Sequence, residues 1–268
     1  MKRLLAVFAL TLAACSSGSN AGTGTAKEAA LPTYDVKELP PGPVGDSIRY
    51  GHDIIVRTQV LMKDYVRSDM SCAACHLDAG TKSKGGSLVG AYNRFPQWNK
   101  RSGRVITLQD RLAECFLYSM NGRPPAYSSK EMIALVSYVS WLSRGMPNLA
   151  KERPGDRFII PLPSEQPNVA HGAQIYAQKC VACHQANGAG VSGTFPPLWG
   201  DTSFNNGAGM AHLDRMTGFV RYNMPKNAPG SLSVKDAYDV SAFVLSRKRP
   251  RFHGERLVAP EPTPARYF

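Results

Sequence analysis

Two copies of one five-residue motif constrain this chain more than any other feature. Residues 72–76 read Cys-Ala-Ala-Cys-His, and residues 180–184 read Cys-Val-Ala-Cys-His. Two cysteines separated by two residues and followed at once by histidine form the attachment signal for c-type haem. The chain has only six cysteines, so the repetition argues against a chance match. A pair of zinc sites, the alternative, needs further Cys or His clusters at ligand spacing, which the sequence does not supply.

The motifs therefore predict two covalently bound haem c groups. In each motif the thiols bond to the haem, and the histidine takes one axial position on the iron. The predicted attachment cysteines and histidine ligands are Cys72, Cys75 and His76 for the first haem, and Cys180, Cys183 and His184 for the second.

An internal repeat surrounds the two motifs. Gly51-His-Asp-Ile-Ile matches Gly172-Ala-Gln-Ile-Tyr, and each is predicted to open a helix that leads to a haem motif. The first copy has 13 extra residues before its cysteines. Closing helices are predicted over residues 129–142 and 233–246, because each opens on serine with an acid in its first turn. This order is typical of class I cytochrome c domains, so we predict an all-α fold with two such domains in tandem.

The N-terminus predicts export. A positively charged start and a short apolar run lead to Leu-Ala-Ala-Cys, which ends at Cys15 and resembles a bacterial lipobox. Cys15 is then lipidated, with an ordinary secretory signal as the alternative. Either way the protein is expected in the periplasm, and Ser16 favours the outer membrane. The predicted segments are a lipoprotein signal peptide (1–15), a flexible tether (16–44), an N-terminal cytochrome c domain (45–146), a Pro-rich linker (147–167), a C-terminal cytochrome c domain (168–249) and a basic tail (250–268). A structured extension near residues 34–39 is the alternative to the end of the tether.

Each iron also needs a second axial ligand or an open position. In the second half, Met224-Pro225 follows His184 by 40 residues and resembles the Met-Pro of class I cytochromes c. This position favours Met224 as the ligand over its rivals Met210 and Met216.

The first half offers a helix between Thr107, which forms a capping box with Asp110, and Gly122. On it Arg111, Cys115 and Ser119 are spaced i, i+4 and i+8 and share one face. A guanidinium one turn from a thiol favours the thiolate, so this face would present a cation, a soft anionic sulfur and a hydroxyl together.

Two residues compete for the first iron. Aligning the repeats by Phe116 and Phe219 puts Met120 near Met224, whereas Cys115 lies 39 residues after His76, which is also within range. Five residues on a helix rotate by about 140°, so both side chains cannot point at one iron. The sequence pattern alone leaves His/Met and His/Cys ligation open.

The chain resembles a known family, the periplasmic dihaem thiosulfate dehydrogenases that form tetrathionate. The most specific stretch is Cys-Phe at residues 115–116 with Ser-Met-Asn-Gly at 119–122. The likeness also covers residues 85–88, 98–101, 105–108, 195–200, 203–205 and 207–210.

The resemblance implies that the first haem is catalytic, with ligands matching His76 and Cys115. It also implies active-site roles for Arg101, Arg111 and Ser119, although surface or propionate-binding arginines are the alternative for the first two. The second haem would relay electrons, with His and either Lys or Met as ligands. The family's Lys-Met-Pro variant reads Asn-Met-Pro at residues 223–225, so a Lys/Met ligand switch is doubtful for this sequence.

The hypothesis for the reaction is coupling of two thiosulfates to one tetrathionate, which releases two electrons and is reversible in principle. Arg101 and Arg111 would bind sulfonate oxygens, Cys115 would leave the iron and bond one thiosulfate, and Ser119 would hydrogen-bond the anion. An excess of basic residues, 32 Lys and Arg against 20 Asp and Glu, suits an anionic substrate or an acidic redox partner, and nucleic acid is excluded by the compartment.

Three other classes of protein share parts of this pattern. A dihaem electron carrier or docking module would have His/Met ligation at both irons and no small-molecule turnover. A carrier-dependent sulfur-oxidising cytochrome would need a protein-borne substrate. A dihaem peroxidase would need an open or His-ligated haem, and no histidine stands in the right place.

Overall fold

The computed structural model describes residues 34–146, 148 and 158–252. The described residues all belong to one compact unit. The predicted signal peptide, Cys15, most of the predicted tether, residues 147 and 149–157 of the linker and residues 253–268 of the tail lie outside the described residues. No helix in the described ranges is both long and apolar enough to cross a membrane.

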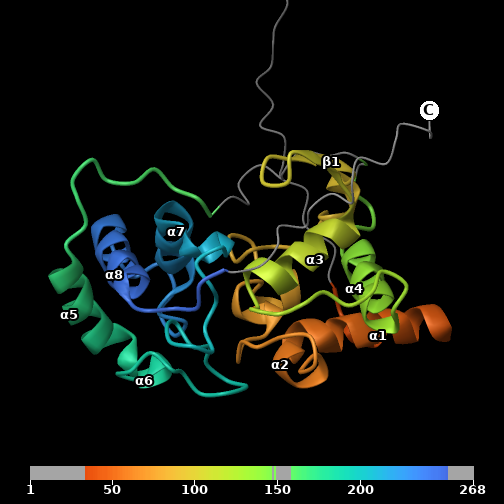
Figure 1. Ribbon diagram of the computed structural model, residues 1–268, viewed down its shortest axis with the longest axis horizontal. Coiled ribbons are helices and arrows are strands. Elements are labelled where there is room, and N and C mark those ends of the chain that lie inside the picture. The colour runs from red at the N-terminus through yellow and green to blue at the C-terminus, as the bar shows by residue number, and fades with distance from the viewer. Residues whose placement is uncertain (1–33, 147, 149–157, 253–268) are drawn as a thin grey trace, which may run out of the picture. The chain divides into compact units, whose positions relative to one another are not determined.

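Helices dominate the described residues, as the sequence predicts (Figure 1). The α-helices are α1 (Pro43–Val56), α2 (Thr58–Leu61), α3 (Leu108–Tyr118), α4 (Lys130–Trp141), α5 (Val169–Lys179), α6 (Val181–His184), α7 (Leu213–Asn223) and α8 (Val234–Ser246). Short 3-10 helices are η1 (Val36–Glu38), η2 (Cys72–Ala74), η3 (Asp78–Gly80), η4 (Tyr92–Arg94) and η5 (Gly209–Ala211). Strands β1 (Gln97–Asn99) and β2 (Arg104–Ile106) form an antiparallel hairpin that the sequence prediction missed.

The repeated glycines mark the same helix crossing in both halves. A Cβ on Gly51 of α1 would collide with the Ala134 carbonyl of α4, and one on Gly172 of α5 would collide with the Asp239 carbonyl of α8. Only glycine lets the two backbones of each pair approach so closely. Gly51 therefore lies in the middle of α1 and does not open it, because α1 begins eight residues earlier at Pro43. Figure 1 shows α1 beside α4 and α5 beside α8.

A buried carboxylate reinforces the second crossing. Asp239 of α8 has no exposed surface and accepts hydrogen bonds from Lys235 Nζ (2.6 Å), His171 Nδ1 (2.9 Å) and the Asn168 amide (2.8 Å). Burial by itself would raise the pKa of Asp239, but these donors outweigh burial and hold the pKa below its usual range. The ionised carboxylate thus ties the start of α5 to α8.

Replacing Asp239 with asparagine is expected to lower the free energy of unfolding at pH 7 by about 2–3 kcal/mol, because charge-assisted hydrogen bonds are lost from a buried site. The pKa of Asp239 is depressed on folding, so its contribution is complete above about pH 4 and is lost as the pH falls through the folded-state pKa. Denaturant unfolding of both proteins from pH 7 down to pH 3 checks this. A difference that grows with acid would contradict it; Asp236→Asn, at a half-exposed neighbouring site, is the control.

The segment before α1 packs on the first domain. Leu39 is buried, and the Tyr34 ring lies 5.4 Å from that of Trp141 in an edge-to-face arrangement. Residues 34–44 therefore form the structured extension that was the alternative to a flexible tether. Burial of the apolar side chain of Leu39 favours this packing.

Helix α3 begins as predicted and ends earlier. The Thr107 hydroxyl accepts from the Asp110 amide, and the Asp110 carboxylate accepts from the Thr107 amide, which completes the capping box. The helix ends at Tyr118 and not at Gly122, because Asn121 takes the left-handed conformation at φ 54°. Gly122 is required instead for close approach to the Tyr65 carbonyl.

Side-chain amides join the two halves near the end of α3. Asn121 Nδ2 donates to the Ser203 carbonyl (2.7 Å), and buried Asn205 Nδ2 donates to the Leu117 carbonyl (3.0 Å). These bonds hold the loop that precedes η5 against the helix that carries Cys115.

Candidate functional site

A threonine from the extra residues of the first half holds the first haem motif. Thr58, fully buried at the start of α2, accepts a hydrogen bond from the Cys72 amide (2.9 Å) and lies 3.2 Å from Cys72 Sγ. Its hydroxyl also lies 2.7 Å from the Ile54 carbonyl of α1. The insertion that distinguishes the two repeats therefore fixes the attachment peptide to α1.

Both motif histidines are oriented for metal binding. His76 Nδ1 lies 2.5 Å from the Gly86 carbonyl oxygen, and His184 Nδ1 lies 3.0 Å from the Pro196 carbonyl oxygen. A carbonyl accepts a hydrogen bond only from a protonated Nδ1, so each Nε2 keeps its lone pair for a metal. Burial lowers the pKa of both imidazoles, which favours the neutral, ligating form.

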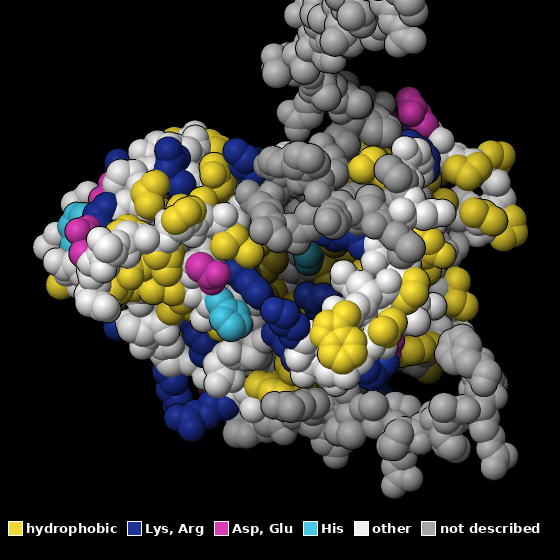
Figure 2. Space-filling model, turned by 90° about the horizontal axis from the view of Figure 1, so that it is seen from above, with side chains coloured by type: hydrophobic (Ala, Val, Ile, Leu, Met, Phe, Trp, Pro, Cys, Tyr) yellow, Lys and Arg dark blue, Asp and Glu magenta, His cyan; other side chains and the backbone are white. Residues whose placement is uncertain are grey.

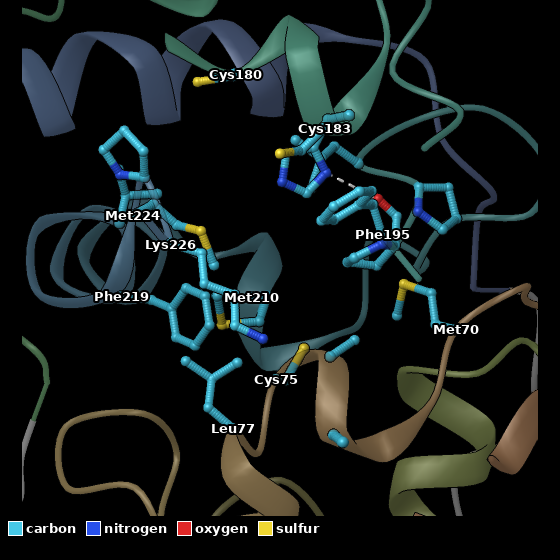
Figure 3. Close-up of a pocket in the computed structure, with 18 of the residues that line it drawn as sticks. Met70, Cys75, Leu77, Cys180, Cys183, Phe195, Met210, Phe219, Met224 and Lys226 are labelled. Atoms are coloured by element: carbon cyan, nitrogen blue, oxygen red, sulfur yellow. Dashed lines mark hydrogen bonds between the residues drawn. The ribbon is translucent and has the colours of Figure 1, made fainter. Parts of the chain in front are cut away.

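The second motif opens into a cavity of about 440 Å³ (Figure 3). Cys180 and Cys183 lie on one side, and Met224 lies across the cavity with its sulfur directed inward; His184 also lines the cavity. Met210 also points into the cavity, and Met216 lines it, so the structure brings all three candidate methionines to this space. Apolar walls, two thiols and paired N and S donors fit a haem c.

The first haem motif forms part of the same cavity wall. Cys75 and Leu77 of the first half line it together with Cys183 of the second (Figure 3). The two attachment peptides therefore flank one apolar space, which suits electron transfer between two haems.

Asn223, the residue before Met224, serves a structural purpose. It is 1% exposed, and its Nδ2 donates to the Lys84 carbonyl (2.8 Å) and to the Phe219 carbonyl (3.0 Å). The Asn-Met-Pro sequence thus fastens the end of α7 to the loop of the first half that also carries Gly86.

Cys115 lies on the part-exposed face of α3, close to the first motif. Arg111 Nη1 lies 3.5 Å from Cys115 Sγ, one helical turn away. Burial, together with the neighbouring charges of Cys72 and Cys115, raises the pKa of the Cys75 thiol to about 12. The charge on Arg111 also contributes to the lowered pKa of His76. The thiol, the guanidinium and the first haem motif are therefore neighbours.

Met120 has a different environment from Cys115. It is 4% exposed, and its sulfur accepts a hydrogen bond from the Ser68 hydroxyl at 3.6 Å within the core of the first half. Of the two residues that the sequence pattern left as rivals, only Cys115 has the guanidinium neighbour.

Arg101 is held by both halves of the molecule. It sits in the turn between β1 and β2, its guanidinium lies 4.0 Å from the centre of the Tyr118 ring, and Nη2 donates to the Gly207 carbonyl (3.1 Å). A cation over an aromatic face and a carbonyl acceptor give the side chain one preferred direction. Ser119 is the residue at which α3 ends, with its amide donating to the Cys115 carbonyl (3.0 Å).

Several residues that support these side chains were not predicted from the sequence, namely Thr58, Asn99, Glu114 and Tyr118. A signal for the hairpin is present: Asn99 is followed by Lys-Arg-Ser-Gly, and Gly103 takes a φ of 66°. Asparagine and glycine at these turn positions are typical of a hairpin loop.

Comparison with known proteins decides the family. Residues 62–148 match the family described as SoxA/TsdA, cytochrome c domain, and residues 169–248 match the Cytochrome c family. A thiosulfate dehydrogenase of Stutzerimonas stutzeri is 39% identical over 236 residues, which are 86% of this chain and 76% of that protein. One of Allochromatium vinosum is 38% identical over 223 residues, 80% of this chain and 82% of that protein. The chain belongs to the thiosulfate dehydrogenase family.

The same assignment follows from a solved structure. The thiosulfate dehydrogenase TsdBA from Marichromatium purpuratum is similar with a TM-score of 0.77 and 33% identity, over 84% of this chain and 51% of that one. This thiosulfate dehydrogenase family member thus spans about half the length of the Marichromatium chain. The predicted tandem cytochrome c domains and two haem c groups are confirmed.

Membership also confirms the predicted activity. Dihaem thiosulfate dehydrogenases oxidise thiosulfate to tetrathionate, and the alternative of a plain electron carrier is not favoured.

Proposed function

We propose that thiosulfate is oxidised beside the first haem, with Cys115 as the reacting side chain and Arg111 and Arg101 as the anion-binding groups. The observation that carries this assignment is the Arg111–Cys115 pair, 3.5 Å apart and adjacent to the first haem motif. His76 and Cys115 would hold the iron of the first haem.

The electrostatics of the site suit a doubly charged anion. Arg111 is 45% exposed, and the charges of Cys115 and Glu114 raise the pKa of its guanidinium, so it stays cationic. A planar guanidinium binds the oxygens of a sulfonate in bidentate fashion. In Figure 2, Lys and Arg side chains gather around a hollow on one face of the molecule, where they would attract anions.

The proposed chemistry at Cys115 balances in two steps. The Cys115 thiolate and the outer sulfur of one thiosulfate form an S–S bond and release two electrons. The outer sulfur of a second thiosulfate then attacks the sulfur that the first thiosulfate contributed. Tetrathionate leaves, and the Cys115 thiolate is restored. Ser119, at the end of α3, would donate a hydrogen bond to the bound anion.

The second half would carry the electrons away. Each haem, when bound, can take up one electron, so two haems hold the pair that one turnover releases. His184 and Met224 both line the cavity beside the second haem motif and would hold the second iron. Methionine ligation raises the reduction potential, which favours transfer toward this half.

Steady-state turnover of purified holoprotein tests the function. With thiosulfate and an artificial electron acceptor, tetrathionate is expected in a ratio of one per two thiosulfates, and near-infrared spectra should show one thiolate-ligated and one methionine-ligated haem. A holoprotein with two reducible haems that forms no tetrathionate would contradict the proposal, as would methionine ligation at both irons.

The location and partners of the enzyme are also proposed from its sequence. The lipobox at residues 12–15 supports export to the periplasm and a lipid anchor on Cys15, favoured at the outer membrane, and the basic composition supports an acidic acceptor cytochrome or membrane redox protein. Radiolabelled palmitate should be incorporated by the wild-type chain. Equal incorporation into Cys15→Ser would contradict the anchor.

A further inference from the structure

A buried carboxylate stands beside the proposed reacting side chain and has no part in the mechanism above. Glu114 of α3 is 3% exposed and directly precedes Cys115. Its Oε2 accepts from Arg111 Nη1 (3.4 Å), and its Oε1 accepts from Asn99 Nδ2 (2.8 Å). A buried carboxylate is costly unless it is paired, and Arg111 and Asn99 supply a hydrogen bond to each of its oxygens.

The Asn99 contact extends the connection to the second arginine. Asn99 is the last residue of β1, and its Oδ1 accepts from the backbone amides of Arg101 (2.8 Å) and Ser102 (3.4 Å). The amide of Asn99 thus fixes the turn that carries Arg101, and Glu114 fixes the amide. One carboxylate therefore has bonds leading to both arginines.

The donors on Arg111 show what this arrangement leaves for a substrate. Arg111 Nη1 has two hydrogens, and they are directed to Glu114 Oε2 and Cys115 Sγ. Nη2 and Nε make no hydrogen bond with any described residue. That edge of the guanidinium carries two parallel N–H groups, the geometry that suits bidentate binding of a sulfonate.

We propose that Glu114 is a positioning residue that sets the direction of Arg111 and, through Asn99, the position of Arg101 for binding thiosulfate. The inference rests on the proposed function and adds to it a residue that does not contact the substrate. The two oxygens of Glu114 act separately: Oε2 orients the guanidinium next to the thiolate, and Oε1 holds the hairpin.

Two substitutions separate the contact of Glu114 with Arg111 from its contact with Asn99 in the hairpin. In Glu114→Gln the remaining carbonyl oxygen can still accept from Asn99, but the new amide cannot anchor Arg111. We expect kcat to fall by about 10–100-fold, with little rise in KM, because a negative charge near the anion has also been removed. In Asn99→Ala the hydrogen bonds that Asn99 makes with Glu114 and with the hairpin turn are lost, while Glu114 still holds Arg111. We expect mainly a rise in KM for thiosulfate.

Further readouts distinguish positioning from a general structural role. Glu114→Gln should shift the near-infrared band of the thiolate-ligated haem, because Arg111 also donates to Cys115, while haem content and Tm stay close to wild type. Glu114→Ala should show both kinetic effects, and Asn99→Ala should cost less when it is added to Glu114→Ala than when it is made alone. Glu131→Gln, which alters a glutamate on α4 that contacts Lys130 and Tyr50, is the matched control with unchanged kinetics.

The possible outcomes distinguish the positioning role of Glu114 from the proposed function of the protein. Wild-type kcat and KM in Glu114→Gln, or losses in both variants that simply follow loss of haem or of Tm, would overturn the positioning role. An inactive wild type with both haems reducible would overturn the proposed function instead. The activity of the wild-type holoprotein is therefore measured first.

Discussion

Replacing Cys115 with alanine is expected to lower tetrathionate formation by about 10³-fold or more while both haems stay covalently attached. The four attachment cysteines and both motif histidines are untouched, and Cys115 lies on the part-exposed face of α3, so the fold should persist. Without the sulfur, no S–S bond to thiosulfate can form. Tetrathionate assays, the haem absorption spectrum and the near-infrared spectrum check the three parts of this expectation.

Two matched variants make that result specific. Cys115→Ser keeps the size of the side chain but lacks the soft sulfur, and it should be as inactive as the alanine variant. Met120→Leu replaces a buried methionine with a residue of similar volume, so it should retain most of the activity and both haems. Substantial turnover in Cys115→Ala, or loss of the first haem's ligation in Met120→Leu, would show that the ligands have been assigned the wrong way round.

Repeated local patterns made the fold predictable from the sequence. The haem motifs, the capping box at Thr107 and the serine caps of α4 and α8 depend on side chains within one turn of each other. The position of Gly51 in the middle of α1 was not predictable. Glycine is required there by close contact with α4, which is distant in sequence.

The site was predictable only in part for the same reason. Arg111, Cys115 and Ser119 share one helix face, so their spacing brings them together. Arg101 reaches its place through a hairpin, the Tyr118 ring and the Gly207 carbonyl of the other half, none of which leaves a local signal near Arg101 itself. A resemblance to a family was needed to select it.

Met120 and Cys115 illustrate where a sequence pattern is ambiguous. Matching the repeats by Phe116 and Phe219 puts Met120 near Met224, yet α3 ends at Tyr118 and Asn121 turns the chain, and Met120 lies within the core. In the second half α7 ends one residue before Met224, which leaves that side chain at the cavity. The two halves diverge at this point because their helices end at different positions relative to the methionine.

Replacing Arg111 with alanine is expected to lower kcat/KM for thiosulfate by about 10²–10³-fold. The guanidinium lies next to the reacting sulfur and has an edge of two unused donors, so its loss removes both charge and direction at the place where two anions must meet. Kinetics at several ionic strengths measure the effect, and the dependence of KM on salt should weaken in the variant because a part-exposed cation is lost from the anion-binding site. Arg57→Ala, at an exposed residue after α1, is the control with unchanged kinetics.

Lysine in place of Arg111 or Arg101 separates the effect of charge from the effect of guanidinium geometry. Arg111→Lys keeps a cation, but an ammonium cannot hold Glu114 and Cys115 through one nitrogen and present two parallel donors through another. It should therefore recover KM more fully than kcat. Arg101→Lys should affect KM more than kcat. Among the described residues Arg101 is fixed by Tyr118 and Gly207 and makes no hydrogen bond with the Cys115 thiol, so it should act mainly in binding the anion. If both lysine variants matched the wild type, charge alone would suffice, and the oriented guanidinium beside Cys115 would have no special part in joining two thiosulfates.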